Sequence, residues 1–544
     1  MRNLCKVLSA GIFAVIGSLF LSCTSEAPHN LDVKLDTAIS DSIEVVFTGD
    51  IKMLFEQTDI TVKNGHVKLP EYIANIFGGS VMTTHDSNDM TMSKILDTLD
   101  GVEYDDVVLA FNAEKVEGLE GMLVFGLTDK KDFINSLKKI DPDLREGMAQ
   151  DFVTIGHGGH HILIKDNLAY CAFNDYGELM PDEAARIIER WNRYAETAPL
   201  AAWKKDYLTQ KRVMNGLISV STITSSTDHL MKHSVMAQFN SLSPVDKDGY
   251  IGFGANLEGP SLKFFVSNFD KGGKICDTDM NGNFNTEMMR FASPDDIIAI
   301  SWCLNQKGYE FIAQASANPS LKKNMQLAQP YAELSREIYG FLSRYGDVPA
   351  EYLSEGGVFV AGGLASDFSL TDFLKPSAYH FVLAADLKPG KAEAAYAGIV
   401  KNINSLLSDS PARYSLSNVT LNGISQKAVS IPYVSDYDNM AGISATSNLE
   451  CYVALVGNIL VVSNKPVCRY ESNPFSKDIF SGKMMAAQVI LPATSPIMEI
   501  AGIKTGFEIW SESDGTTGEL VISFPDTDRK FIPELFGLLS SYDI

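Results

Sequence analysis

Basic residues are scarce in this chain of 544 residues relative to acidic ones. Lys and Arg number 45 against 68 Asp and Glu, which gives a formal charge of −23 at pH 7. A surface this acidic repels the phosphate backbone of nucleic acids and the headgroups of anionic lipids. We therefore expect no nucleic-acid partner, and we interpret the charge mainly as a solubilising surface. An acidic face that attracts a cationic ligand is the alternative.

Cysteine is also sparse, and its spacing is irregular. The sequence has seven cysteines, and no two of them stand in a Cys-x-x-Cys pattern. A zinc cluster or a disulfide framework is therefore not expected, although an oxidising compartment would allow one or two disulfides. The phosphate-binding loop, the dinucleotide-binding fingerprint, His-Glu-x-x-His and Gly-x-Ser-x-Gly are missing as well, so no common enzyme class is indicated.

The N-terminus has the composition of an export signal. Arg2 and Lys6 form a short positive region, and the next fifteen residues, Val7 to Leu21, are uncharged and mostly apolar. A stretch of this length fits the core of a signal peptide and is short for a membrane span. No later run is apolar and long enough to cross a bilayer.

The segment Leu19-Phe20-Leu21-Ser22-Cys23 resembles the lipobox of bacterial lipoprotein signals. The resemblance implies cleavage of a signal peptide over residues 1–22 and acylation of Cys23, with palmitate among the usual chains. Several acyl chains anchor a protein without a transmembrane helix, because each buried methylene contributes about 0.8 kcal/mol. Residues 23–40 are polar and lack periodicity, so we expect an acylated tether there. The expected location is the bacterial cell envelope, at the outer membrane, on a face that the sequence leaves open.

The rest of the chain is too long for one hydrophobic core, and it repeats one order of landmarks. Residues 41–285 and 286–544 each open with an apolar strand, and each continues with a helical stretch, two strands, an amphipathic helix, a hairpin and closing strands. The two hairpins turn at Asp166-Asn167 and Gly457-Asn458, whose residues tolerate positive φ. We therefore predict an α+β fold with two similar lobes from an internal duplication. Each lobe should be a largely antiparallel sheet with helices packed on one face.

Three further segments are Pro294-Asp295-Asp296-Ile297-Ile298-Ala299-Ile300, Asn318-Pro319-Ser320-Leu321 and Gly356-Gly357-Val358. Together with the lipobox, they resemble a family of large lipoproteins of Bacteroidota that carry a domain of unknown function. The family often has Asp-Gly where this chain has Glu355-Gly356. The resemblance implies an envelope location and a domain plan, and it transfers no catalytic residue.

Three of the nine histidines, His157, His160 and His161, lie within six residues of one another. Imidazoles this close could share Zn²⁺ or Cu²⁺. We interpret the run as an exposed turn, because its glycines make the backbone flexible and adjacent residues of an extended chain face opposite sides. We therefore expect no metal or catalytic role here, and no buried carboxylate within hydrogen-bond reach of the rings.

Lys504-Thr505-Gly506 matches the third motif of penicillin-binding serine enzymes. Ser316-Ala317-Asn318 and Ser136-Leu137-Lys138-Lys139 could supply the other two motifs. Triplets this short arise by chance, and Ser136 falls in an amphipathic helical pattern. We therefore assign no catalytic residue on this basis.

These patterns favour a non-enzymatic envelope lipoprotein, a two-lobed binding or scaffolding module held at the membrane by its acyl chains. No cofactor is expected, and neither a small-molecule ligand nor a protein partner is indicated. The alternative is an envelope hydrolase, which could be metal-dependent through the histidine-rich turn or could use a cleft that the sequence does not reveal.

Overall fold

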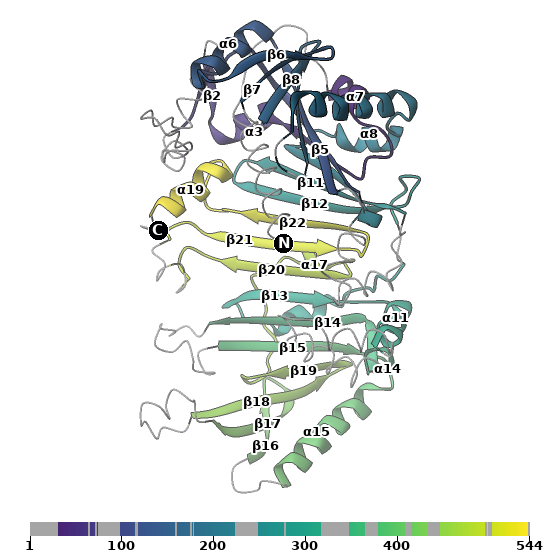
Figure 1. The fold of residues 1–544 in the computed structure, drawn as a ribbon. Helices are drawn as coiled ribbons and strands as arrows, with labels where there is room; N and C mark the ends of the chain where they lie inside the picture. The colour runs from purple at the N-terminus through teal and green to yellow at the C-terminus, as the bar shows by residue number, and fades with distance from the viewer. Residues whose placement is uncertain are drawn as a thin grey trace. The chain divides into compact units, whose positions relative to one another are not determined.

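In a computed structural model of the chain, the described residues form two compact units. Unit 1 comprises those up to Cys276 and those from Thr527 on, and unit 2 those between Asp279 and Asp526. Both units are mixed α+β with antiparallel sheets (Figure 1). The described residues are 31–63, 66–70, 73, 98–114, 118–157, 160–174, 177, 179–222, 248–276, 279–316, 348–364, 379–408, 415–433, 447–495, 498 and 503–541. The predicted signal peptide and the lipidation site Cys23 lie outside them.

Among the described residues of unit 1, ten strands pair in the antiparallel order β12-β11-β10-β1-β4-β5-β9-β8-β7-β6. Strand β1 begins with Val45-Val46-Phe47, a run that favours strand, and it is central because β10 and β4 flank it. The strands are β1 (Val45–Asp50), β4 (Val102–Glu114), β5 (Gly118–Leu127), β6 (Arg145–Ala149), β7 (Phe152–His157), β8 (His160–Lys165), β9 (Leu168–Asn174), β10 (Met214–Ser219), β11 (Tyr250–Glu258) and β12 (Ser261–Phe269). The short strands β2 (Thr61–Lys63) and β3 (His66–Lys68) pair separately.

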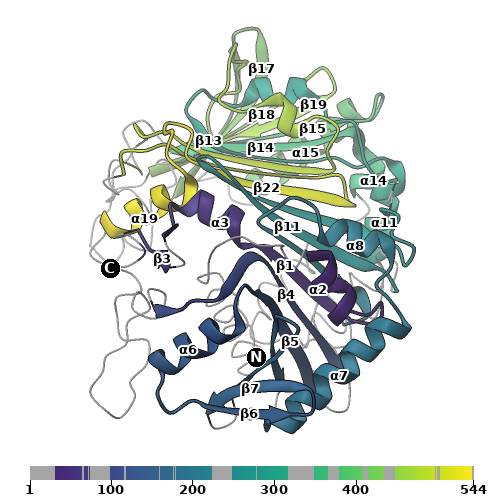
Figure 2. The same ribbon diagram turned by 90° about the horizontal axis from the view of Figure 1, so that it is seen from above.

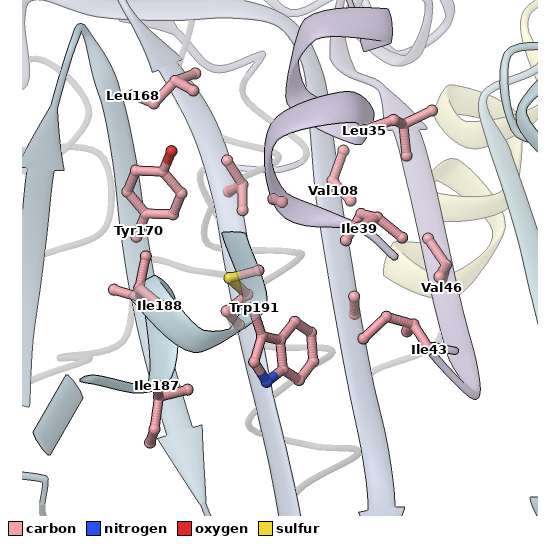
Figure 3. Packing of buried hydrophobic residues seen from close by; sticks show 14 of the residues in the cluster. Leu35, Ile39, Ile43, Val46, Val108, Leu168, Tyr170, Ile187, Ile188 and Trp191 are labelled. Carbon is pink, nitrogen blue, oxygen red and sulfur yellow. The ribbon is translucent and has the colours of Figure 1, made fainter. Parts of the chain in front are cut away.

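Helices cover both faces of this sheet, whereas the sequence predicted helices on one face. Val108 and Ala110 of β4 belong to a core with helices α2 (Leu31–Ala38), α7 (Pro181–Thr197) and α8 (Ala202–Leu208), part of which Figure 3 shows. Val107 and Leu109 belong to a second core with α3 (Ile51–Thr58) and α6 (Lys130–Ile140). Figure 2 shows α6 on the opposite side of β4 and β5 from α7. Because successive residues of a strand face opposite sides and both sets are apolar here, each face needs its own cover.

Residues 31–40 were expected to belong to the tether, but most of them form helix α2 and pack into unit 1. Leu35, Ala38 and Ile39 are fully buried in the first core. Lys34 is buried as well, and its Nζ donates a hydrogen bond to the backbone oxygen of Asp106 at 2.9 Å. The folded part of the chain therefore begins at or before Leu31. The helix has only two turns, which is too short for its apolar spacing to stand out in the sequence.

Among the described residues of unit 2, ten strands pair in the antiparallel order β22-β21-β20-β13-β14-β15-β19-β18-β17-β16. They are β13 (Asp296–Trp302), β14 (Leu353–Leu364), β15 (Tyr379–Leu387), β16 (Ser415–Leu421), β17 (Ile424–Tyr433), β18 (Ser447–Val456), β19 (Ile459–Ser463), β20 (Met485–Leu491), β21 (Phe507–Ser513) and β22 (Thr517–Ser523).

Helical segments lie against both faces of the unit 2 sheet too. The 3₁₀ helix η1 (Thr286–Phe291) and helix α17 (Lys477–Phe480) contribute to the core on one face. Helix α15 (Ala392–Ser408) packs on the other face, and the remaining helices are α11 (Gln306–Ser316) and α14 (Val348–Tyr352). No helix in the described parts of the chain is long and apolar enough to cross a membrane.

The C-terminal segment belongs to unit 1, although the sequence assigned all of 286–544 to the second lobe. Helix α19 (Phe531–Ser541) buries Phe531, whose N–H donates to the backbone oxygen of Gly259 at 2.7 Å. Lys530 forms an ion pair with Asp59, just after α3. The boundary between unit 1 and unit 2 also lies after Cys276, whereas the sequence placed it after residue 285. A return of the chain to an earlier unit leaves no local pattern in the sequence.

Candidate functional site

A cavity of about 320 Å³ in unit 1 is the best candidate for a binding site. It lies where β1 ends and α3 begins. Its floor is formed by Thr48 and Asp50 of β1, Asp106 of β4 and Asn215 of β10. The N-terminus of α2 and the loop from Leu208 to Arg212 complete its lining.

The strand register places these floor residues on one face of the sheet. Asp50 pairs directly with Asp106, and Thr48 pairs directly with Asn215. Side chains directly opposite each other in an antiparallel pair point to the same side. This side also carries the core that lies under α2, α7 and α8, so the cavity is a polar pocket at the edge of that core.

Hydrogen bonds from the floor hold the loop that borders the cavity. Thr48 Oγ1 donates to the backbone oxygen of Leu208 at 2.7 Å. Asn215 Nδ2 donates to the backbone oxygens of Leu208 at 3.2 Å and Gln210 at 2.8 Å. Thr48 and Asn215 are both buried, so these bonds are shielded from water and fix the shape of the rim.

Three carboxylates line the cavity, and two of them, Asp50 and Asp106, are neighbours with the same charge, whereas Asp32 pairs with Lys205 at 3.2 Å. Asp50 caps the N-terminus of α3, where its Oδ1 accepts a hydrogen bond from Met53 N at 2.7 Å. The Asp106 carboxylate receives no hydrogen bond and no ion pair from the described residues, since Lys34 binds the backbone oxygen of Asp106 instead. Burial raises the pKa of Asp106 to about 6, with Lys34 opposing this rise and Asp50 adding to it. Burial raises the pKa of Asp50 too.

Arg212 supplies the opposite charge at the other side of the cavity. Its guanidinium carbon lies 4.7 Å from the ring centroid of Phe265 and 5.6 Å from that of Tyr207. Its Nη1 donates to Asn215 Oδ1 at 3.4 Å. The side chain passes over Gly254, where an added Cβ would lie 2.4 Å from Nη1. The described residues place no carboxylate within ion-pair distance of Arg212, so the guanidinium is held in position by rings and an amide.

The histidine-rich turn connects β7 and β8 of unit 1. His157 pairs directly with His160, and both side chains are exposed; His161 pairs with Gly156 and is half-buried. The sequence analysis considered only that adjacent residues such as His160 and His161 face opposite sides, and it missed the cross-strand pair of His157 with His160. Within the described ranges, no group of three or more His, Cys, Asp or Glu side chains is arranged to hold a metal ion.

The residues that match motifs of penicillin-binding enzymes do not form a site in the described structure. Ser136 is buried in α6, and its Oγ donates to the backbone oxygen of Phe133 at 2.8 Å. Lys504-Thr505-Gly506 precedes β21 in unit 2, and Gly506 N donates to Asp526 Oδ2 at 3.1 Å. The side chain of Ser316 and all of Asn318 lie outside the described residues. Ser136 is therefore part of the helix rather than an accessible nucleophile.

One buried pair in unit 2 was not found from the sequence. His380 Nδ1 lies 2.6 Å from Asp296 Oδ1, and Asp296 Oδ2 accepts a hydrogen bond from Ser293 N at 2.7 Å. Such a pair forms part of many hydrolase triads. The described residues provide no hydroxyl or thiol that is hydrogen-bonded to His380, and both partners are buried. The pair therefore joins the first residue of β13 to β15, which is a structural role.

The five described cysteines, Cys171, Cys276, Cys303, Cys451 and Cys468, are free thiols.

Comparison with known proteins gives little. No protein-family model matches the chain. No curated protein matches it either. Two solved structures are weakly similar: crystal form I of TP0453, with a TM-score of 0.25 and 10% identity over 43% of this chain and 77% of that one, and its crystal form III, with a TM-score of 0.26 and 12% identity over 46% and 83%. A likeness of this size assigns neither a family nor a function.

Proposed function

We propose that this chain is an envelope lipoprotein that works as a non-enzymatic binding module, tethered to the membrane by acylated Cys23, with its ligand site in the unit 1 cavity. The observation that carries the proposal is a cavity lined by the carboxylates of Asp50 and Asp106 and the guanidinium of Arg212, none of which forms an ion pair with a described residue, on a rim held by buried hydrogen bonds. Small-molecule sites are concave, largely pre-formed and equipped with a few fixed polar groups.

The position of the cavity in the chain fits a tethered binding protein. Leu31 and Asp32, which line it, are the first two described residues. Seven residues, 24–30, lie between Cys23 and Leu31, and the eight Cα–Cα steps from one to the other span at most about 28 Å. An acylated Cys23 would therefore hold the cavity close to the membrane surface, at the outer membrane in this proposal.

The anchor is tested by metabolic labelling with a clickable fatty acid. Wild type should incorporate the label and sediment with membranes. Cys23→Ala should lose the label and either leave the membrane fraction or stop at the precursor. Cys5→Ala is the matched control, because Cys5 would leave with the signal peptide and its loss should change nothing. Undiminished labelling of Cys23→Ala would remove the lipoprotein proposal.

We also propose that the two units descend from an internal duplication. Their strand orders correspond place by place, with β1 in the position of β13 and β12 in the position of β22. The hairpin turn Asp166-Asn167 is followed by β9, which pairs with β5. The turn Gly457-Asn458 is followed by β19, which pairs with β15, the strand in the corresponding place of unit 2. Asp166 and Asn167 both have positive φ, as the sequence predicted, and so does Gly457.

Irregular features recur as well, and these support the duplication more strongly than the strand order does. In β4, the step from Val102 to Val107 lies opposite a step of only two residues in the partner strand. In β14, the step from Leu353 to Val358 also lies opposite a step of two residues in its partner. Leu127 N donates to Asn167 O at 2.8 Å, and Leu387 N donates to Asn458 O at 2.9 Å. Shared bulges are typical of related domains, because they are kept within families. Aligning relatives of the two units tests this: the best alignment should match these bulges, and an alignment offset by a strand would contradict the proposal.

The duplication bears on the cavity. Gly49 pairs with Val107 and Met214, while Trp302 pairs with Val358 and Met485. The next residue of β1 is Asp50, and the equivalent residue of unit 2 is Cys303. By the same register, Gly357 stands where unit 1 has Asp106, and Ala486 stands where it has Asn215. The same strand order forms in unit 2 without these charges, so the fold does not require them. Binding of a ligand would explain why unit 1 has them.

A further inference from the structure

We propose that the unit 1 cavity binds a short peptide of two or three residues, with the peptide's terminal ammonium group at Asp50 and Asp106 and its terminal carboxylate at Arg212. This inference rests on the binding function proposed above and names the ligand class of that site. It combines three observations on the described residues: the cavity, two adjacent carboxylates of which only Asp50 accepts a hydrogen bond, and a guanidinium with no acidic partner.

The anionic side needs donors. Two carboxylates directly opposite each other in a sheet repel each other. No described residue donates a hydrogen bond to the Asp106 carboxylate, and only one oxygen of Asp50 is occupied, by the cap of α3. An ammonium group has three donors and no acceptor, so it can satisfy both carboxylates at once and cancel their repulsion.

The cationic side needs an acceptor. The planar guanidinium of Arg212 presents a fork of N–H donors that matches a carboxylate in a bidentate arrangement. Its stacking against Phe265 and its contact with Asn215 limit its rotamers before a ligand arrives. A side chain that is already ordered loses less conformational entropy on binding.

The spacing between the two sides limits the size of the ligand. The ammonium end of the ligand binds at β4 and β1, and Arg212 lies over β11, which is three strand spacings, about 14 Å, from β4. A hydrogen bond at each end takes up about 3 Å of such a span. The remaining distance of about 8 Å exceeds the backbone of one amino acid and fits that of two or three, at about 3.5 Å per residue. A cavity of about 320 Å³ is at the lower end of ligand pockets and agrees with this size.

The same spacing explains why the charges of the cavity do not neutralise one another. Arg212 is held over β11 and β12 by Gly254 and Phe265, one strand beyond Asn215. Asp106 lies on the far side of β1 from these strands. A ligand with both charges can bridge the two sides, whereas a simple amine or a simple carboxylate would satisfy only one of them.

Isothermal titration of the mature chain carrying Cys23→Ala, residues 23–544, tests the proposal. The probes are glycylglycine, alanylalanine, triglycine and trialanine at pH 7.5. At least one should bind with micromolar affinity. Asp106→Asn and Arg212→Gln should each weaken that binding by about tenfold or more, because each removes a charge-assisted hydrogen bond. Asp105→Asn is the matched control: it removes the neighbouring acid of β4, which does not line the cavity, and should leave the affinity within about twofold.

Blocked ligands and metal ions complete the experiment. The N-acetyl and methyl ester forms of the ligand that binds should each lose the same factor of about ten, since each lacks one charge. The proposal is overturned if no probe binds, if binding survives both Asp106→Asn and Arg212→Gln, or if Ca²⁺ or Mg²⁺ binds and the peptides do not. A different small molecule that copurifies with the protein and depends on Asp106 would overturn this ligand class while leaving the proposed binding function intact.

Discussion

Replacing Asp106 by asparagine should make unit 1 more stable at pH 8. The folded-state pKa of Asp106 is raised from 3.8 to about 6, mainly by burial. The folded protein therefore holds a proton on Asp106 at pH values where the unfolded chain has lost it, and stability falls as pH rises through this window. Above pH 6 the carboxylate is ionised in both states, and the folded state bears the full free-energy cost of a charge that is partly removed from water. A shift of about two pH units corresponds to about 3 kcal/mol.

Urea unfolding at pH 8 and at pH 4 measures this effect. Fluorescence reports unit 1 alone if Trp302 and Trp510 are changed to Phe, because the two other tryptophans, Trp191 and Trp203, lie in that unit. Asp106→Asn should add about 3 kcal/mol at pH 8 and less than about 1 kcal/mol at pH 4, because pH 4 is close to the unfolded-state pKa of 3.8 and far below the folded-state pKa, so that ionisation favours the unfolded chain only slightly. An asparagine variant that is no more stable than wild type at pH 8, or whose advantage is the same at both pH values, would refute the argument that the half-buried carboxylate has no partner among the described residues.

Three further outcomes are expected, all read as the unfolding free energy of unit 1. Leu35→Ala should lower this free energy by about 2–5 kcal/mol because Leu35 is fully buried. Val33→Ala, at a side chain 45% exposed in the same helix, should change it by less than about 0.5 kcal/mol. Equally small effects of both changes would mean that α2 is part of a loose tether. Phe531→Ala should cost about 3–5 kcal/mol in unit 1, and an unchanged value would detach the C-terminal segment from that unit. His160→Ala should change it by less than about 0.5 kcal/mol, because the side chain is exposed, and a larger loss would give the histidine turn a structural role.

Local features of unit 1 could be predicted from the sequence, because short-range physics determines them. The Asp166-Asn167 turn forms with both residues at positive φ, as such residues allow. The helix predicted near residues 131–140 is α6, whose N-cap Asp129 accepts hydrogen bonds from Lys131 N and Asp132 N. The mixed α+β character and the antiparallel pairing also follow from hairpins and alternating strands.

Long-range features were missed because their signal is not local. Alternation in β4 reveals two sets of side chains, but only the tertiary structure shows that both sets are covered by helices. The cavity brings together Asp50, Asp106 and Arg212 from three places far apart in the sequence. None of them stands in a recognisable motif, and a lone aspartate at the end of a strand is read most simply as surface. The possibility of a cationic ligand on an acidic face was weighed from composition alone, without any residue to carry it.

Native mass spectrometry of the protein, released from its own membranes in detergent, tests the central claim most directly. The account predicts a chain that lacks residues 1–22, carries acyl chains on Cys23 and holds a small non-covalent ligand. Asp106→Asn should keep the acyl chains and lose the ligand, because the substitution alters the cavity and leaves the anchor untouched. A chain without acyl chains, or an acylated chain that retains the same ligand after Asp106→Asn, would contradict the account.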